Sequence, residues 1–225
     1  MTDADPQALA RLMRARFSCR AFLSEPVPEE TLVRIVEASR WAASWSNVQP
    51  WDMLITRPET TRRLADLLVG LARARVAVEP DLPYPPAFEG VYLQRRREVG
   101  FGLYNALGIA RDDRAAREAH FLENFRFFGA PHVALLTMPA AMGAYGALDA
   151  GNFLSSFMLA AHAEGVATIA QAALAQYAGA IREMFDIPRD RAFLCGVALG
   201  RADSSHSANG FRAPRAAADE IFRFV

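Results

Sequence analysis

Four arginines and one serine, in two short segments near the ends of the chain, are suited to binding an anion. In RFSCRAF, Ser18 lies between Arg16 and Arg20, and an extended or turn conformation places all three side chains on one side. A hydroxyl between two guanidinium groups suits a phosphate or a polyol. Arg212 and Arg215 flank an Ala-Pro pair near the other end. Because each pair alone also fits a solvated charged turn, only their combination predicts an anion site.

A second segment, AASWSNVQPW at residues 42–51, follows a helical pattern and is unusual in its composition. Small residues, an amide at Asn47 and another at Gln49 are flanked by Trp45 and Trp51. This composition indicates contact with a flat group that has polar edges. We expect Trp51 to begin a strand and pack in the core, as aromatic residues after a turn commonly do.

The residue types exclude several chemistries. All 25 basic residues are arginine, which excludes a P-loop lysine, a Schiff-base lysine and a kinase-type ATP lysine. Cys19 and Cys195 are far apart, and Gly100, Gly102 and Gly108 do not have the spacing of a dinucleotide-binding loop. We expect no metal site, because metal-ligand spacing is absent from the four histidines, His120, His132, His162 and His206.

Length and charge give broader limits. The chain has 225 residues, with 25 basic and 25 acidic side chains, so neither nucleic acid nor an anionic membrane is expected as a partner. The apolar runs are too short to span a membrane, and the first residues lack the order of a signal peptide. The sequence therefore predicts a cytoplasmic protein, with residues 1–225 forming one domain.

The periodicity of apolar residues predicts an α+β fold, with a central mixed β-sheet of four or five strands flanked by helices. A proline-rich, irregular stretch at 76–90 interrupts the pattern. Strands are expected at 51–57, 130–139, 165–171 and 191–202. Helices are expected at 6–15, 28–43, 58–75, 91–109, 112–127, 148–165 and 175–188, the sixth of them buried on most sides.

The C-terminal segment combines exposure to solvent with apolar residues. After a loop it alternates Ile221, Phe222 and Phe224 with polar residues. An apolar tail on the outside of a finished domain favours aggregation, so we expect it to pack on another subunit.

Five segments in this order resemble the nitroreductase family of FMN enzymes over nearly the whole chain: RFSCRAF, SNVQPW, NFRFFGAPH, LDAGNFLSSFMLAAHAEGVAT and RAPRAAADEIFRFV. The insertion at 83–113 is similar to the branch that includes nitrobenzoate reductases. The resemblance implies a homodimer with an FMN site at each of two positions in the subunit interface. It also implies a lid-like excursion at 76–110 and a tail at 203–225 that embraces the partner.

The resemblance also assigns cofactor-binding residues. Asn124 approaches the polar edge of the flavin, and the segment from Ser44 to Asn47 reaches the partner's flavin, with Gln49 supporting it. Relatives have a proline and a Glu-Gly pair where this chain has TIAQAAL, so backbone donors to flavin N5 are assigned by position only. The full implied set is Arg16, Phe17, Ser18, Arg20, Ser44, Trp45, Ser46, Asn47, Gln49, Asn124, Ala170, Gln171, Ala172, Arg212 and Arg215.

The implied reaction is hydride transfer from NADH or NADPH to flavin N5 and then to a nitroaromatic or quinone-type small molecule, with ping-pong kinetics. No side chain is predicted to be catalytic, and Arg20 is expected to place positive charge near flavin N1. Trp45, Phe88, Tyr92 and Arg96 are candidates for substrate contacts. For Arg96 and its neighbours the alternative is a solvated helix face.

Two alternatives stay open at the level of the sequence. One is a different flavin reaction on the same scaffold, such as reductive dehalogenation, enone reduction or oxidative flavin breakdown. The other is a helical binding protein without redox activity, whose arginines are merely solvated.

Overall fold

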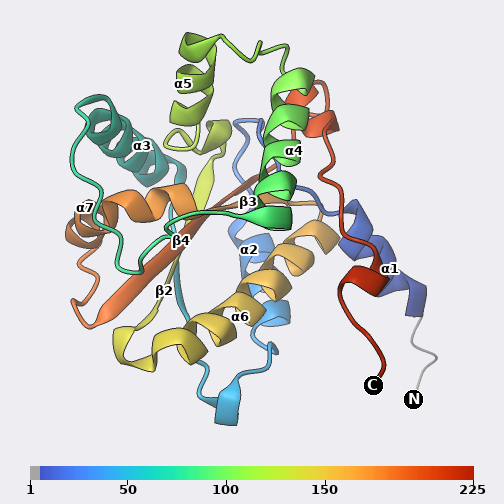
Figure 1. Cartoon of the computed structure of the whole chain (residues 1–225). Helices are drawn as coiled ribbons and strands as arrows, with labels where there is room; N and C mark the ends of the chain where they lie inside the picture. The colour runs from blue at the N-terminus through green and yellow to red at the C-terminus, as the bar shows by residue number, and fades with distance from the viewer. Residues whose placement is uncertain (1–5) are drawn as a thin grey trace.

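Two long strands rich in apolar residues form the centre of the protein. The computed structural model describes residues 6–225, and in it β2 (His132–Pro139) pairs with β4 (Arg191–Gly200). The shorter strands β1 (Asp52–Ile55) and β3 (Ala167–Gln171) complete a sheet with the order β1-β2-β4-β3 (Figure 1). This arrangement confirms the expected α+β fold with a central sheet.

The sheet is antiparallel rather than mixed. All three strand pairings that the structure describes are antiparallel, and the register of β2 against β4 shifts at Leu136 and Thr137. The parallel contact is a single bridge from Ser18 to Thr168 on the outer edge of β3. Apolar composition predicts that a strand is buried but carries no information about its direction, which is why the sequence did not distinguish the two sheet types.

Seven helices surround this sheet in the described residues. They are α1 (Pro6–Ala15), α2 (Glu29–Ser39), α3 (Pro58–Arg73), α4 (Gly90–Ala106), α5 (Arg114–Leu122), α6 (Gly143–Ala163) and α7 (Ala178–Met184). All seven were expected, although α6 begins five residues earlier and α2 ends before residue 43. Turns of 3-10 helix connect several of them, including one at Trp45–Asn47.

Alternate residues of β2 belong to the cores on opposite faces of the sheet. Val133 and Leu135 pack with α3 and α7, whereas Ala134 packs with Ile35 of α2 and Phe157 of α6. This is the period of two that a strand covered on both faces requires. The sheet is therefore a rigid layer between two helical layers (Figure 1).

Two elements are less buried than their composition predicts. Strand β1 was expected to be buried, yet it is an edge strand whose Asp52 and Leu54 are exposed. Helix α6 was expected to be buried on most sides, yet Tyr145 is 63% exposed and Leu148 is 62% exposed. No element within residues 6–225 covers the apolar face of α6 or the outer edge of β1.

The proline-rich stretch between α3 and α4 is irregular, as expected, but it is held against the body. The Glu79 amide donates to the Gln176 carbonyl at 3.0 Å. The Asp81 carboxylate pairs with Arg182 of α7 and accepts from the Phe193 amide at 2.7 Å. These contacts fix the first half of the stretch to α7 and β4.

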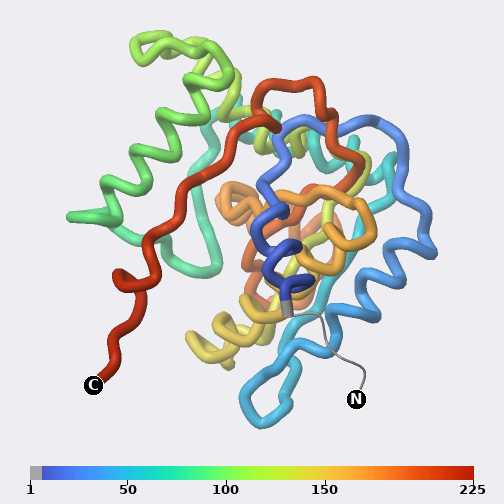
Figure 2. Tube along the Cα trace, turned by 90° about the vertical axis from the view of Figure 1, so that its right-hand side faces the viewer, coloured from blue at the N-terminus to red at the C-terminus, as the bar shows by residue number. Residues whose placement is uncertain are grey.

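The C-terminal residues leave the sheet and run between α4 and α1, with a short turn at Ala218–Glu220 (Figure 2). Ile221 and Phe222 are exposed, and Phe224 is 94% exposed. No helix within residues 6–225 combines the length and the apolar character that crossing a membrane requires.

Candidate functional site

The segment that follows α1 lies along the outer edge of β3. The Arg16 amide still donates to the Leu12 carbonyl at 2.9 Å, so α1 extends to the start of the segment. Two residues later the chain is extended, and the Cys19 amide donates to the Thr168 carbonyl at 3.0 Å. The side chains of Arg16, Ser18 and Arg20 are half-buried there.

One buried amide joins this segment to the C-terminal part of the chain. Asn209 is 5% exposed, and its Oδ1 accepts from the Arg20 amide at 2.8 Å. Its Nδ2 donates to the carbonyls of Ala21 and Asp203, each at 2.8 Å. Sequence reasoning missed Asn209, because an Asn before Gly is typical of any surface turn.

The two arginine pairs predicted from the sequence line one cavity of about 620 Å³. The Arg212 guanidinium lies 4.0 Å from the centre of the Phe17 ring and donates to the Asn209 carbonyl at 2.6 Å. The lining residues are Met13, Arg14, Arg16, Phe17, Ser18, Arg20, Val99, Phe211, Arg212, Ala213, Arg215 and Ile221. The structure thus brings together six of the predicted residues from both ends of the chain.

The electrostatics of this cavity favour an anion. Within residues 6–225, none of Arg16, Arg20, Arg212 and Arg215 forms an ion pair with a carboxylate. Burial lowers the pKa of Arg16, and the positive charge of Arg215 lowers it further. Burial also lowers the pKa of Arg20. Since arginine stays charged in proteins, these like charges are held together by the fold, and an anion between them would relieve the repulsion.

The residues from Ser44 to Gln49 form a second cluster, against the first turns of α6. The Trp45 amide donates to Asp149 Oδ1 at 3.0 Å, and the Trp45 ring lies 5.0 Å from that of Tyr145. Ser46, Asn47 and Gln49 all have positive φ, a conformation that is costly outside glycine and common at functional sites. The backbone N–H of Gln49 donates to Ser44 Oγ at 3.0 Å, which stabilises the turn.

The two clusters lie at opposite ends of α6. Asp149 contacts the Trp45 segment, whereas His162, near the last turn, has its pKa lowered by burial and by the charge of Arg16. Thirteen residues of helix separate them, or about 20 Å. Figure 1 shows the same separation, with the turn at Trp45–Asn47 at the bottom and α1 at the right. Within one chain the predicted cofactor-binding residues are therefore not all in one place.

A third group of predicted residues meets at the end of β3. Gln171 is buried, and its Nε2 donates to the Asn124 carbonyl at 2.8 Å, while its Oε1 has no partner within the described residues. Ala170 and Ala172 on either side are exposed. The Tyr84 hydroxyl donates to the Ala172 carbonyl at 2.7 Å, a contact that was not predicted.

The predicted substrate-contact residues are divided in the same way. The Arg96 guanidinium of α4 lies 5.2 Å from the centre of the Phe88 ring, so these two residues form a unit. Tyr92 is exposed on the first turn of α4, and Trp45 is exposed at the other cluster. Arg95, the neighbour of Arg96, pairs with Glu220 of the tail at 2.9 Å.

The protein has an α+β fold, and an arginine-lined cavity lies at one edge of its sheet. These features define a candidate binder of a phosphorylated ligand. Comparison with known proteins identifies the family: the model of the nitroreductase family matches residues 13–201. The chain therefore belongs to the nitroreductase family.

Individual relatives agree with this assignment. The chain is 41% identical to nitroreductase NfnB of Mycolicibacterium smegmatis over 219 residues, which cover 97% of this chain and 93% of the relative. It is 33% identical to a 4-nitrobenzoate reductase of Nocardioides sp., over 89% of this chain and 83% of the relative. The crystal structure of the FMN-dependent nitroreductase NfnB from Mycobacterium smegmatis in complex with NADPH superposes with a TM-score of 0.92 at 40% identity, covering 97% and 98% of the two chains.

We call the three hydrogen bonds of the Asn209 side chain the clamp, and replacing Asn209 with alanine tests it. Asn209→Ala removes three hydrogen bonds and leaves the Arg20 amide without its partner, so the free energy of unfolding should fall by about 2–4 kcal/mol. Denaturant unfolding monitored by circular dichroism measures this change. The control is Asn152→Ala, because Asn152 is exposed and its side chain makes one hydrogen bond, of 3.5 Å, within the described residues. This change should alter stability by less than about 0.5 kcal/mol. Equal effects of the two changes would contradict the clamp.

Proposed function

We propose that the chain is an FMN-dependent oxidoreductase that uses NADPH or NADH to reduce nitroaromatic or quinone-type acceptors. One observation carries the proposal: four arginines that form no ion pair with a carboxylate in the described part of the chain converge with Ser18 on one cavity. The relatives support it, since they include enzymes named as nitrobenzoate reductases and a nitroreductase described as FMN-dependent and in complex with NADPH.

The residues present fit FMN. A cavity of about 620 Å³ lies within the range of cofactor and ligand sites. Arg212 and Arg215 are the residues proposed for the phosphate, and the segment from Arg16 to Arg20 is proposed for the ribityl chain and the pyrimidine edge. Ala170 and Ala172, which are exposed on either side of the buried Gln171, are the residues proposed to lie beside the ring. When bound, FMN supplies two-electron hydride chemistry that no side chain here provides.

The protein's own part in the reaction is positioning and electrostatics. Arg20 would hold a positive charge at the pyrimidine edge of bound FMN, which would stabilise a negative charge there. Tyr84 holds the Ala172 carbonyl, which orients the peptide groups that follow β3. Tyr84 belongs to the proline-rich stretch, so its hydrogen bond to Ala172 ties the first half of the proposed lid at 76–110 to the end of β3.

We propose that two copies of the chain complete each site. The arginine cavity and the Ser44–Gln49 cluster lie at opposite ends of α6, so a twofold axis that sets two α6 helices antiparallel would bring one cluster to the other subunit's cavity. Tyr145 and Leu148 on the outer face of α6 would then be covered. The exposed tail residues Phe222 and Phe224 would pack on the partner, which would remove their apolar side chains from water.

We propose that the acceptor binds between aromatic side chains from both subunits. Phe88 and Tyr92 are carried by the excursion and α4, and Trp45 would come from the partner. Arg96, stacked on Phe88, is placed to bind an acceptor carboxylate such as that of a nitrobenzoate. A cytoplasmic location would supply the reduced nicotinamide donor and agrees with the two cysteines being free.

An anaerobic spectral titration tests the reaction. The purified protein should show flavin absorbance that bleaches when NADPH or NADH is added without oxygen, because hydride transfer precedes acceptor binding. Adding 4-nitrobenzoate after removal of the donor should then restore the absorbance. A protein that stays colourless when FMN is supplied would contradict the proposal, and benzoate serves as the control that cannot accept electrons.

Mixing two defective variants tests whether the site is shared. Arg215→Ala impairs the cavity and Asn47→Ala impairs the cluster proposed to reach across, so a mixed dimer keeps one undamaged site. After random exchange of subunits about a quarter of all sites should be intact and retain FMN.

The control mixture combines Arg215→Ala with Arg16→Ala, which damage the same cavity and should recover nothing. FMN retained per chain after gel filtration measures both mixtures. Recovery that is no greater in the first mixture than in the control would contradict a site built from two chains.

A further inference from the structure

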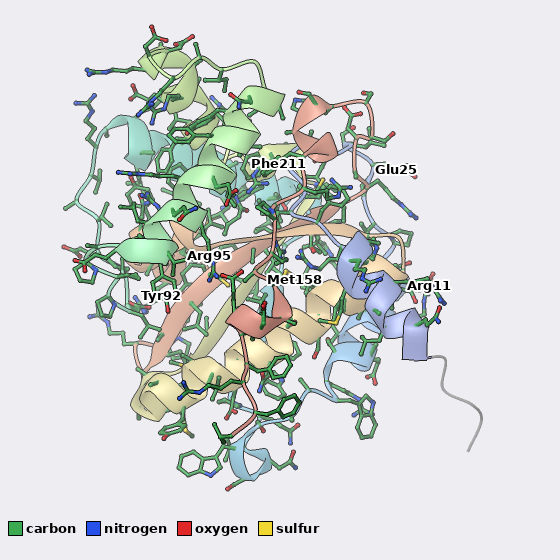
Figure 3. The ribbon with its side chains drawn as sticks, turned by 45° about the vertical axis from the view of Figure 1, so that its right-hand side comes forward. Arg11, Glu25, Tyr92, Arg95, Met158 and Phe211 are labelled. Atoms are coloured by element: carbon green, nitrogen blue, oxygen red, sulfur yellow. The ribbon has the colours of Figure 1, made fainter. Side chains whose placement is uncertain are left out.

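Helix α4 and the tail meet at a glycine. A Cβ atom added to Gly102 would lie 2.5 Å from Cε2 and 3.0 Å from Cζ of Phe211. The Phe211 ring therefore rests directly on the backbone of α4, in a notch that only glycine provides. Figure 3 shows Phe211 against this helix.

Phe211 immediately precedes the arginine that reaches into the cavity. The Arg212 Nη1 donates to the Phe211 carbonyl at 3.0 Å and to the Asn209 carbonyl at 2.6 Å. The guanidinium is stacked on Phe17 on its other side. A displacement of Phe211 would therefore displace the Arg212 guanidinium relative to the rest of the cavity.

Further contacts with the tail lie on the same face of α4. Arg95, Val99 and Gly102 are spaced at i, i+4 and i+7, which places them in one stripe along the helix. Arg95 pairs with Glu220 at 2.9 Å, and Figure 3 shows it beside the short turn of the tail. Val99 and Ile221 both line the arginine cavity. We call Arg95, Val99 and Gly102 the tail-facing stripe.

We infer that Gly102 and Phe211 are positioning residues for the phosphate-binding arginines, so that α4 sets the location of Arg212. The inference rests on the proposed function and extends it. Helix α4 also carries Tyr92 and Arg96, which are proposed for the acceptor, so the tail-facing stripe connects the acceptor end of the site with the phosphate end. A change in the position of α4 then alters affinity for the cofactor.

Gly102→Ala separates this role from ordinary helix stability. Alanine within a helix is more favourable than glycine, so without Phe211 the change would stabilise α4. The new methyl group instead pushes the ring, and with it Arg212, out of place. We therefore expect a loss of FMN affinity without a loss of thermal stability in the apoprotein.

The measurement is titration of full-length apoprotein with FMN, followed by quenching of flavin fluorescence. Gly102→Ala should raise the Kd about tenfold. The matched control is Gly100→Ala in the same helix, where an added Cβ meets nothing within 4 Å, and its Kd should stay within about twofold of the wild type.

A compensating variant gives the decisive comparison. Phe211→Leu removes the ring edge that the methyl group strikes, so Gly102→Ala/Phe211→Leu should bind FMN about threefold or more tightly than Gly102→Ala alone. Phe211→Leu on its own should weaken FMN binding, because the notch is then poorly filled. This single change also keeps the test conclusive if Gly102→Ala does not fold.

The outcomes distinguish two failures. If Gly102→Ala binds FMN like the wild type, or the double variant is no better than Gly102→Ala, the positioning role is wrong while the proposed function stands. If Phe211→Leu binds like the wild type, the positioning role is also wrong. If the wild-type apoprotein does not bind FMN under the same conditions, the proposed function itself fails, and this inference with it.

Discussion

The side-chain amide of Asn209 is the constraint on which the arginine cavity depends. It satisfies three backbone groups from two segments that lie nearly the whole chain apart, at residues 20–21 and 203. Each such bond contributes only about 1 kcal/mol, but leaving a buried partner unsatisfied costs more. The clamp therefore holds the two segments in one register, and the arginines of both segments face the same cavity as a consequence.

The positively charged arginines of the cavity repel one another when no anion is bound. The pKa of Arg16 is lowered by burial and by Arg215, which means that its charged form is less stable than in water. The sheet edge, the clamp and the stacking of Arg212 on Phe17 offset this repulsion. A site held in this way needs little rearrangement to receive a phosphate, and that preorganisation favours tight binding.

Several apolar or open surfaces of the described residues are exposed to solvent. The exposed face of α6, the open edge of β1 and the apolar tail have no covering element within residues 6–225. The strained turn at Ser46 and Asn47 lies beside one of these surfaces. The second copy of the chain proposed above would cover the face of α6 and the tail.

Local patterns predicted the helices well, because amphipathic spacing and proline at helix starts are properties of neighbouring residues. The sequence predicted that Arg16, Arg20, Arg212 and Arg215 act together, and the structure has all four lining one cavity, while their assignment to FMN stays a proposal. The exposure of β1 and α6 was predicted wrongly, since apolar composition does not distinguish a buried core from an exposed apolar surface. Asn209 and Tyr84 were missed because their roles depend on partners almost ninety residues away or more, which no local pattern records.

The most direct measurement compares the affinity of the apoprotein for FMN with that for riboflavin, which has the same ring and ribityl chain but no phosphate. If the arginine cavity binds the phosphate, FMN should bind at least about a hundredfold more tightly, as expected for several charge-assisted hydrogen bonds. The difference should shrink as salt concentration rises. Equal affinity for the two compounds would contradict the account, because Arg212 and Arg215 would then have no role in binding the phosphate.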